Sequence, residues 1–98
     1  MNYAEIVQAD RRLVILKVLQ DSAAYACNEH LLGSLLGSFG HVITADRLRT
    51  DLAWLAEQGL ISVRDVGGVE IATIVQRGLD VAQGIASVPG VKRPAPGA

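Results

Sequence analysis

The sequence predicts an α+β domain in which three helices precede a two-stranded hairpin and a short fourth helix. Three observations carry this prediction. Apolar residues recur with a helical period up to Gln58, two β-rich runs then flank Gly67-Gly68, and a Pro- and Gly-rich stretch ends the chain. Ninety-eight residues suffice for one hydrophobic core. We therefore expect a single domain over residues 1–84 and an extended or disordered arm over residues 85–98.

The three long helices are predicted from apolar spacing and capping residues. Between Tyr3 and Gln20 the apolar residues fall at helical intervals with charged residues between them. Asn28 is expected to cap a second helix and Thr44 a third, because their side-chain oxygens can accept an orphan amide proton of the first turn. The segment between the first two helices is expected to be a loop. Gly59 is expected to end the third helix in a left-handed conformation.

The third helix has two distinct faces at about 100° per residue. One face is expected to pack in the core, and it consists of Ala45, Leu48, Leu52, Leu55 and Ala56. The opposite face is expected to point outward, and it consists of Asp46, Arg47, Thr50, Ala53, Trp54 and Glu57. Trp54 is expected to pack against the hairpin or the first helix, or to lie in an interface.

The hairpin is the strongest local signal in the chain. Two β-rich runs, residues 60–66 and 69–74, are separated by Gly67-Gly68, which is typical of a two-residue turn. This turn pairs Val66 with Val69 and places Asp65 opposite Glu70, a mildly destabilising like-charge pair. The core side of the hairpin then consists of Ile61, Val63, Ala72 and Ile74.

This order of elements resembles the winged helix-turn-helix domain, in which the hairpin is the wing. The resemblance is most specific at Asp51–Ile61, which is similar to the end of a recognition helix running into the wing. It extends over about residues 3–84. After the hairpin, Val75 stands where Thr is usual in such regulators, which weakens the cap of the short helix over residues 76–83.

The tail resembles that of a narrower group. The stretch Val88–Pro94 is similar to the tails of small winged-helix proteins of Mu-like phages and prophages, which are labelled as arsenical-resistance-type repressors. The resemblance implies a fold and a phage context more than a function. Metal-sensing members of that repressor family carry paired cysteines on the third helix, and this sequence has none there. We therefore expect no metal inducer.

A winged helix implies binding of double-stranded DNA through the major groove, which admits an α-helix. Burying the leucine face of the third helix turns the opposite face toward the duplex. The residues expected at the DNA are Thr44, Arg47, Arg49, Thr50 and Arg64, with Lys92 and Arg93 as further contacts from the arm. Arg47 and Thr50 are expected to reach base edges or phosphates, and Arg49 and Arg64 phosphates.

Composition bounds these expectations. The net charge is −1, whereas a DNA-binding domain usually carries a basic surplus. A single cysteine, with no zinc spacing and no catalytic motif, predicts neither an enzyme nor a bound metal or cofactor. No apolar run is long enough to span a bilayer, and the N-terminal residues do not resemble a secretory signal, so we expect a cytoplasmic protein.

Two functions remain open. The first is a small phage-type transcriptional regulator, or a DNA-packaging accessory, that binds DNA as a homodimer through the first helix and the arm. The second is a winged helix used for protein interaction or phage assembly, which the balanced charge, the acidic hairpin and the apolar excess favour.

Overall fold

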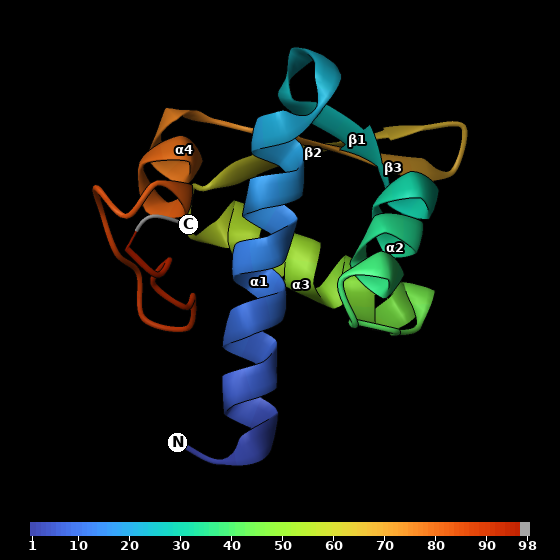
Figure 1. Ribbon diagram of the computed structural model, residues 1–98. Coiled ribbons are helices and arrows are strands. Elements are labelled where there is room, and N and C mark those ends of the chain that lie inside the picture. Colours follow the sequence, from blue (N-terminus) through green and yellow to red (C-terminus); the bar gives the residue numbers. More distant parts are fainter. Residues whose placement is uncertain (97–98) are drawn as a thin grey trace.

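A computed structural model describes residues 1–96 as four α-helices and a three-stranded antiparallel sheet, which confirms the predicted α+β class (Figure 1). Residues 97 and 98, the end of the predicted arm, lie outside the described residues. The elements in chain order are α1 (Tyr3–Asp21), a 3-10 turn (Ala23–Tyr25), β1 (Ala26–Asn28), α2 (Glu29–Ser38), α3 (Ala45–Glu57), β2 (Ile61–Val66), β3 (Val69–Ile74) and α4 (Gln76–Ala82).

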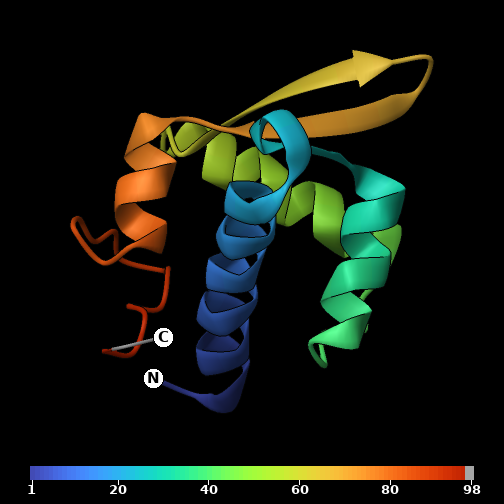
Figure 2. The ribbon, with the colours of Figure 1, turned by 45° about the horizontal axis from the view of Figure 1, so that its top comes forward.

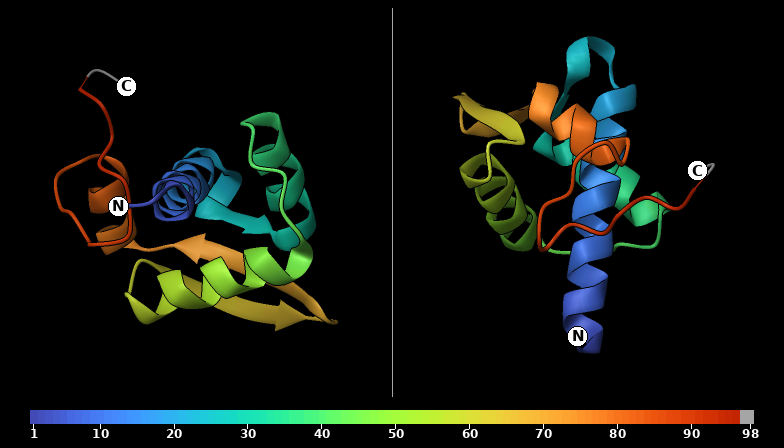
Figure 3. Two further views of the ribbon diagram at one scale, coloured as in Figure 1. Left: turned by 90° about the horizontal axis from the view of Figure 1, so that it is seen from below. Right: turned by 90° about the vertical axis from the view of Figure 1, so that its left-hand side faces the viewer.

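Helix α1 is the centre of the molecule. Seen end-on, it lies between α2 on one side and α4 with the arm on the other, while α3 and the β2–β3 hairpin lie together on a third side (Figure 3). Its middle and C-terminal part is almost entirely buried, including Ile15, Leu16 and Leu19 at 0% exposure. Its N-terminal end projects beyond the other elements, so Ile6 is 53% exposed (Figure 1).

The predicted caps occur where the sequence places them. The Asn28 side-chain oxygen accepts hydrogen bonds from the amides of His30 and Leu31, and the Thr44 hydroxyl accepts one from the amide of Arg47. Gly59 ends α3 with a φ of 73°, as expected of a residue without a Cβ. Val75, in contrast, supplies no side-chain cap to α4.

The hairpin has the predicted register, with Val66 opposite Val69 and Asp65 opposite Glu70. Ile61, Ala72 and Ile74 are buried, which confirms the predicted core side. The hairpin tip lies beside α2, on the side of α1 opposite to α4 (Figure 2).

The expected loop between α1 and α2 is in part a strand. β1 pairs antiparallel with β3, with Cys27 opposite Ala72, so the sheet order is β1-β3-β2. Three residues are too few to show an alternating pattern, and the strand forms because β3 offers a free edge. Ala24 and Tyr25 adopt positive φ in the turn that leads into it.

The arm packs on the domain along its described part. Val88 and Val91 are buried and join the hydrophobic core. The amide of Lys92 donates to the carbonyl of Ala9 in α1, at 3.1 Å, so the arm runs along α1 beside α4 (Figure 3). The alternating Pro and Gly residues exclude a helix here, and the two valines supply the apolar surface that holds the extended chain.

Candidate nucleic-acid interface

Helix α3 presents a narrow, mostly polar edge to solvent. Its buried residues are Leu48, Asp51, Leu52 and Leu55, which centre the core face. The residues farthest from that face on the helical wheel are exposed, and they are Asp46, Thr50, Ala53 and Glu57. The predicted leucine face is therefore confirmed, except that Ala45 is exposed and Asp51 is inside. The centre of the outward edge carries two carboxylates and no cation.

Arg47 lies on the flank of α3 that faces α1. It is exposed, and its side chain takes part in no hydrogen bond or ion pair within residues 1–96. It lines a hollow of about 340 Å³ together with Arg11 and the projecting end of α1, including Tyr3 and Gln8. An unpaired guanidinium at the rim of an open hollow is free to bind an anion.

Arg49 lies on the opposite flank, beside the hairpin, and it is already paired. Its Nε donates to Oε1 of Glu29 at 2.8 Å and its Nη2 donates to Oε2 at 2.6 Å, a bidentate ion pair. The Arg49 hydrogen bonds, followed by one from the Glu70 amide, lower the pKa of Glu29 to about 2. The same pair raises the pKa of Arg49. The structure thus places Arg49 against protein carboxylates, where the sequence suggests a phosphate contact.

The remaining predicted residues are spread over the surface. Arg64 is exposed on β2 opposite Ile71 and forms no ion pair within the described chain. Lys92 places its ammonium 3.3 Å from Oδ1 of Asp10, and Arg93 donates to the carbonyl of Gly84 at 3.2 Å. Both arm residues thus contact this chain itself, on the side of α1 away from the hairpin tip (Figure 2).

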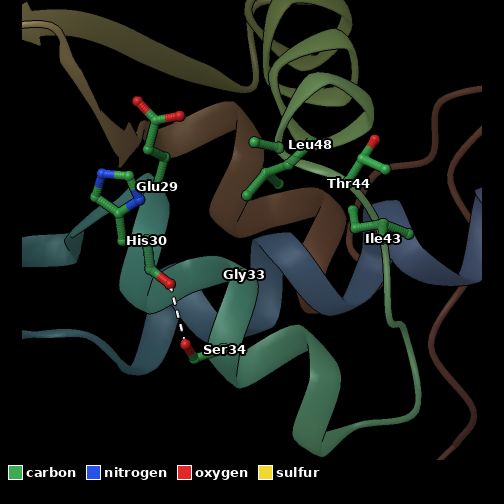
Figure 4. A pocket seen from close by; sticks show the side chains of 8 residues that line it. Glu29, His30, Gly33, Ser34, Ile43, Thr44 and Leu48 are labelled. Atoms are coloured by element: carbon green, nitrogen blue, oxygen red, sulfur yellow. Dashed lines mark hydrogen bonds between the residues drawn. The ribbon is translucent and has the colours of Figure 1, made fainter.

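A hollow of about 290 Å³ separates α2 from the beginning of α3 (Figure 4). Glu29, His30 and Ser34 line it from α2, and Thr44 lines it from the cap of α3. The Ser34 hydroxyl donates to the carbonyl of His30 at 3.2 Å and so is not aimed at a ligand. The hollow opens at the N-terminus of α3, where backbone amides and the positive end of the helix dipole favour an anion.

Gly33 of α2 faces Leu48 of α3 beside this hollow. A Cβ placed on Gly33 would lie 3.7 Å from Leu48 of α3, an ordinary packing distance, whereas one on Gly37 would meet open space. Neither position therefore requires the absence of a Cβ for α2 to pack on α3.

A buried ionic cluster, which the sequence reasoning missed, holds α3 on α1. Asp51 is fully buried and accepts from Nε of Arg11 at 2.6 Å and from Nε of Arg12 at 3.3 Å. The Arg12 guanidinium also lies 3.8 Å from the centre of the Trp54 ring. Trp54 therefore packs on α1, one of the alternatives left open for it. The sequence signal for the burial of Asp51 is its position on the helical wheel, among Leu48, Leu52 and Leu55.

A second polar cluster joins α1 to the arm and to the turn before α3. Nε2 of His41 lies 2.7 Å from Oδ2 of Asp10, whose other oxygen faces Lys92. Partial burial would raise the pKa of Asp10, but the hydrogen bonds to His41 and Lys92 hold it below its usual value. Within residues 1–96 no three His, Cys, Asp or Glu residues come together as metal ligands, and no described helix is long and apolar enough to cross a membrane.

Comparison with known proteins decides the family. No family model matches the chain. The uncharacterized protein gp26 of Escherichia phage Mu is 46% identical over 92 residues, which are 94% of this chain and 95% of gp26. The chain belongs to the family of phage Mu gp26. An uncharacterized protein of Haemophilus influenzae is 41% identical over 80 residues, which are 81% of this chain and 78% of that protein. The predicted resemblance to Mu-like phage proteins is confirmed.

Solved structures confirm the fold of this gp26 relative. RosR of H. salinarum superimposes with a TM-score of 0.64 at 20% identity, over 74% of this chain and 64% of RosR. Two structures of complexes, RosR-S1 and RosR-S4, superimpose with TM-scores of 0.62. The chain thus spans somewhat less than two thirds of RosR, and the likeness establishes a winged-helix fold.

Proposed function

We propose that this protein is a small double-stranded DNA-binding regulator that places α3 in the major groove. One observation carries the proposal. Arg47 lies on the flank of the exposed α3 edge that faces α1, the adjoining hairpin carries the exposed Arg64, and neither arginine forms an ion pair within residues 1–96. A helix that enters the major groove runs between two phosphate backbones, so Arg47 can face one backbone from its flank of α3 while Arg64 can contact a phosphate from the adjoining hairpin. The general role of the third helix in such domains agrees with this placement.

The edge itself has groups that can read bases. The Thr50 hydroxyl, which donates to the carbonyl of Asp46 at 3.0 Å, retains its acceptor lone pairs, and the methyl of Ala53 can contact a thymine methyl. The Asp46 carboxylate can accept from the N4 amino group of cytosine. Thr44 contributes through the α3 N-terminus that it caps, where free amides face a phosphate.

The affinity of one copy is expected to be modest. Of the predicted contacts, Arg49, Lys92 and Arg93 are engaged with this chain, which leaves Arg47 and Arg64 as the main phosphate ligands. Two neutralised phosphates give a slope of log affinity against log salt of about −2. Binding should therefore be strong enough to measure only at low salt, unless two copies bind together.

A homodimer through α1 and the arm would double these contacts. Met1, Tyr3 and Ile6 are 82%, 81% and 53% exposed on the projecting end of α1. Met1 and Ile6 line a hollow of about 270 Å³ with Val91 and Lys92 of the arm. An apolar surface shared by these two elements fits the same surface of a second copy. Light scattering should give twice the monomer mass, and Ile6→Glu should restore the monomer.

The decisive experiment measures binding to DNA fragments from the neighbourhood of the gene. Fluorescence anisotropy at about 50 mM salt should show binding that weakens steeply toward 200 mM. Arg47→Ala should lower the affinity, and Lys17→Ala, which removes the same charge from α1, is the matched control. If no fragment binds, or if the two variants behave alike, the DNA-binding proposal is wrong.

The second candidate is a protein-interaction or phage-assembly module. It is favoured by the two carboxylates at the centre of the α3 edge and by apolar side chains at the end of α2 and beyond it, with Phe39 64% and Val42 88% exposed. Cross-linking of the tagged protein during phage growth, followed by mass spectrometry, tests it. Failure to recover any partner or self-association would remove its support. The resemblance to proteins labelled as arsenical-resistance-type repressors, and the expectation that the protein is not an enzyme, stay predictions of the sequence.

A further inference from the structure

The Arg49–Glu29 pair joins three elements of the fold. Glu29 is the first residue of α2 and Arg49 lies on α3. Nη2 of Arg49 also donates to the carbonyl of Gly68 in the hairpin turn, at 2.9 Å. Oε2 of Glu29 accepts from the amide of Glu70 in β3, at 2.6 Å. One ion pair therefore binds the hairpin to both helices.

The outer part of the hairpin has little other support. β1 pairs with β3 only from Ile71 to Thr73, so the turn lies beyond the three-stranded part of the sheet. Val66 at the tip is 49% exposed, and Arg64 and Asp65 are exposed beside it. Without a buried apolar face, the angle between the tip and α3 depends on polar contacts.

The charges around Arg49 disfavour a phosphate at the same position. Glu29 and Glu70 both lie within ion-pair distance of its guanidinium, the latter at 3.6 Å, and Asp65 is opposite Glu70 on the hairpin. A phosphate would approach three carboxylates and would compete with a bidentate partner that is only 4% exposed. Arg49 also offsets the like-charge pair that the hairpin register creates.

We propose that Arg49 and Glu29 are positioning residues that hold the hairpin at the angle from α3 at which both can contact DNA, and that Arg49 makes no phosphate contact of its own. This inference rests on the proposed DNA binding. The pair acts through Arg64, whose position relative to α3 depends on the hairpin angle.

A direct phosphate contact by Arg49 predicts the opposite behaviour. If Arg49 neutralised a phosphate, Arg49→Ala would make the slope of log affinity against log salt shallower by about 0.9. Glu29→Gln would then free Arg49 and strengthen binding. If the pair positions the hairpin, Arg49→Ala and Glu29→Gln both weaken binding, by about tenfold, and both make the slope shallower to the extent seen in Arg64→Ala, because Arg64 no longer reaches its phosphate.

The test combines this salt titration with amide hydrogen exchange on the full chain without DNA. The amide of Glu70 should exchange at least tenfold faster in Arg49→Ala and in Glu29→Gln than in wild type, because its acceptor is no longer held in place. Arg64→Ala is the control, with a shallower salt slope and unchanged exchange at Glu70. Stronger binding by Glu29→Gln, or a slope that is shallower in Arg49→Ala and unchanged in Glu29→Gln, would overturn the inference.

The exchange measurement separates failure of this inference from failure of the proposed function. If the wild-type protein binds no DNA, the function is wrong, and faster Glu70 exchange in both variants still establishes the connection between hairpin and helices. If DNA binds and exchange at Glu70 is unchanged in both variants, the pair does not hold the hairpin and the inference fails alone.

Discussion

Removal of the Asp51 carboxylate should destabilise the domain more than any substitution on the exposed edge of α3. Asp51 is 0% exposed and is the ion-pair partner of both Arg11 and Arg12, which are 6% and 7% exposed. Asp51→Ala leaves two guanidinium groups out of water without a counter-charge. Breaking a buried ion pair from one side costs about 3 to 5 kcal/mol, because the remaining charge is uncompensated.

This cost is large for a chain of this size. A domain of 98 residues has a total free energy of unfolding of about 5 to 15 kcal/mol. Asp51→Ala should therefore shift the midpoint of urea unfolding, followed by far-ultraviolet circular dichroism, to a much lower concentration. Asp51→Asn keeps the shape of the side chain and should lose less, so it remains measurable if the alanine variant does not fold.

Glu57→Ala is the matched control, since it removes a carboxylate from an exposed position of the same helix. Its free energy of unfolding should stay within about 0.5 kcal/mol of wild type. A loss below about 1 kcal/mol in Asp51→Ala would refute the reasoning, because it would mean that Arg11 and Arg12 regain water without the carboxylate.

Four further outcomes follow from the packing and the charges. Gly78→Ala should lower the free energy of unfolding by about 1 to 3 kcal/mol or more, because its Cβ would lie 2.1 Å from the carbonyl oxygen of Leu60. Gly37→Ala places its methyl group in open space and should raise the free energy of unfolding by about 0.5 kcal/mol. Leu52→Ala should lower the free energy of unfolding by about 2 to 5 kcal/mol, because it removes buried apolar surface and leaves a cavity. A urea midpoint equal to that of wild type would contradict this expectation. Arg47→Ala should leave stability within about 0.5 kcal/mol while it weakens DNA binding. The pKa of Glu29 in the folded protein is about 2, below its ordinary value of 4.5. Its contribution to the free energy of unfolding is therefore complete above pH 4.5 and is lost as the pH falls toward 2. Between pH 5 and pH 3 the free energy of unfolding, measured with urea, should fall less in Glu29→Gln than in wild type. An equal fall in both proteins would exclude this contribution.

Local patterns predicted the helices and the hairpin well. The caps at Asn28 and Thr44, the end of α3 at Gly59 and the pairing of Val66 with Val69 depend on residues within a few positions of one another. A capping oxygen or a Gly-Gly turn acts on its own segment, so its effect can be predicted without knowledge of the rest of the chain.

Contacts between distant segments were not predictable in the same way. The short strand β1 depends on the free edge of β3, about 45 positions later, and the arm is held because α1 presents apolar surface to Val88 and Val91. The predicted site residues illustrate the same limit. Among the described residues Arg47 and Arg64 have no ion-pair partner, but Arg49 is bound to Glu29, and periodicity along one helix contains no information about a carboxylate on another.

The division between local and distant effects has one physical cause. Backbone hydrogen bonding, side-chain period and turn geometry are short-range, and they specified which segments are helices, which are strands and which face of α3 is apolar. Charge pairing depends on distance in space, so only the folded chain decided that Arg11, Arg12 and Arg49 neutralise carboxylates, while Arg47 and Arg64 form no ion pair within residues 1–96.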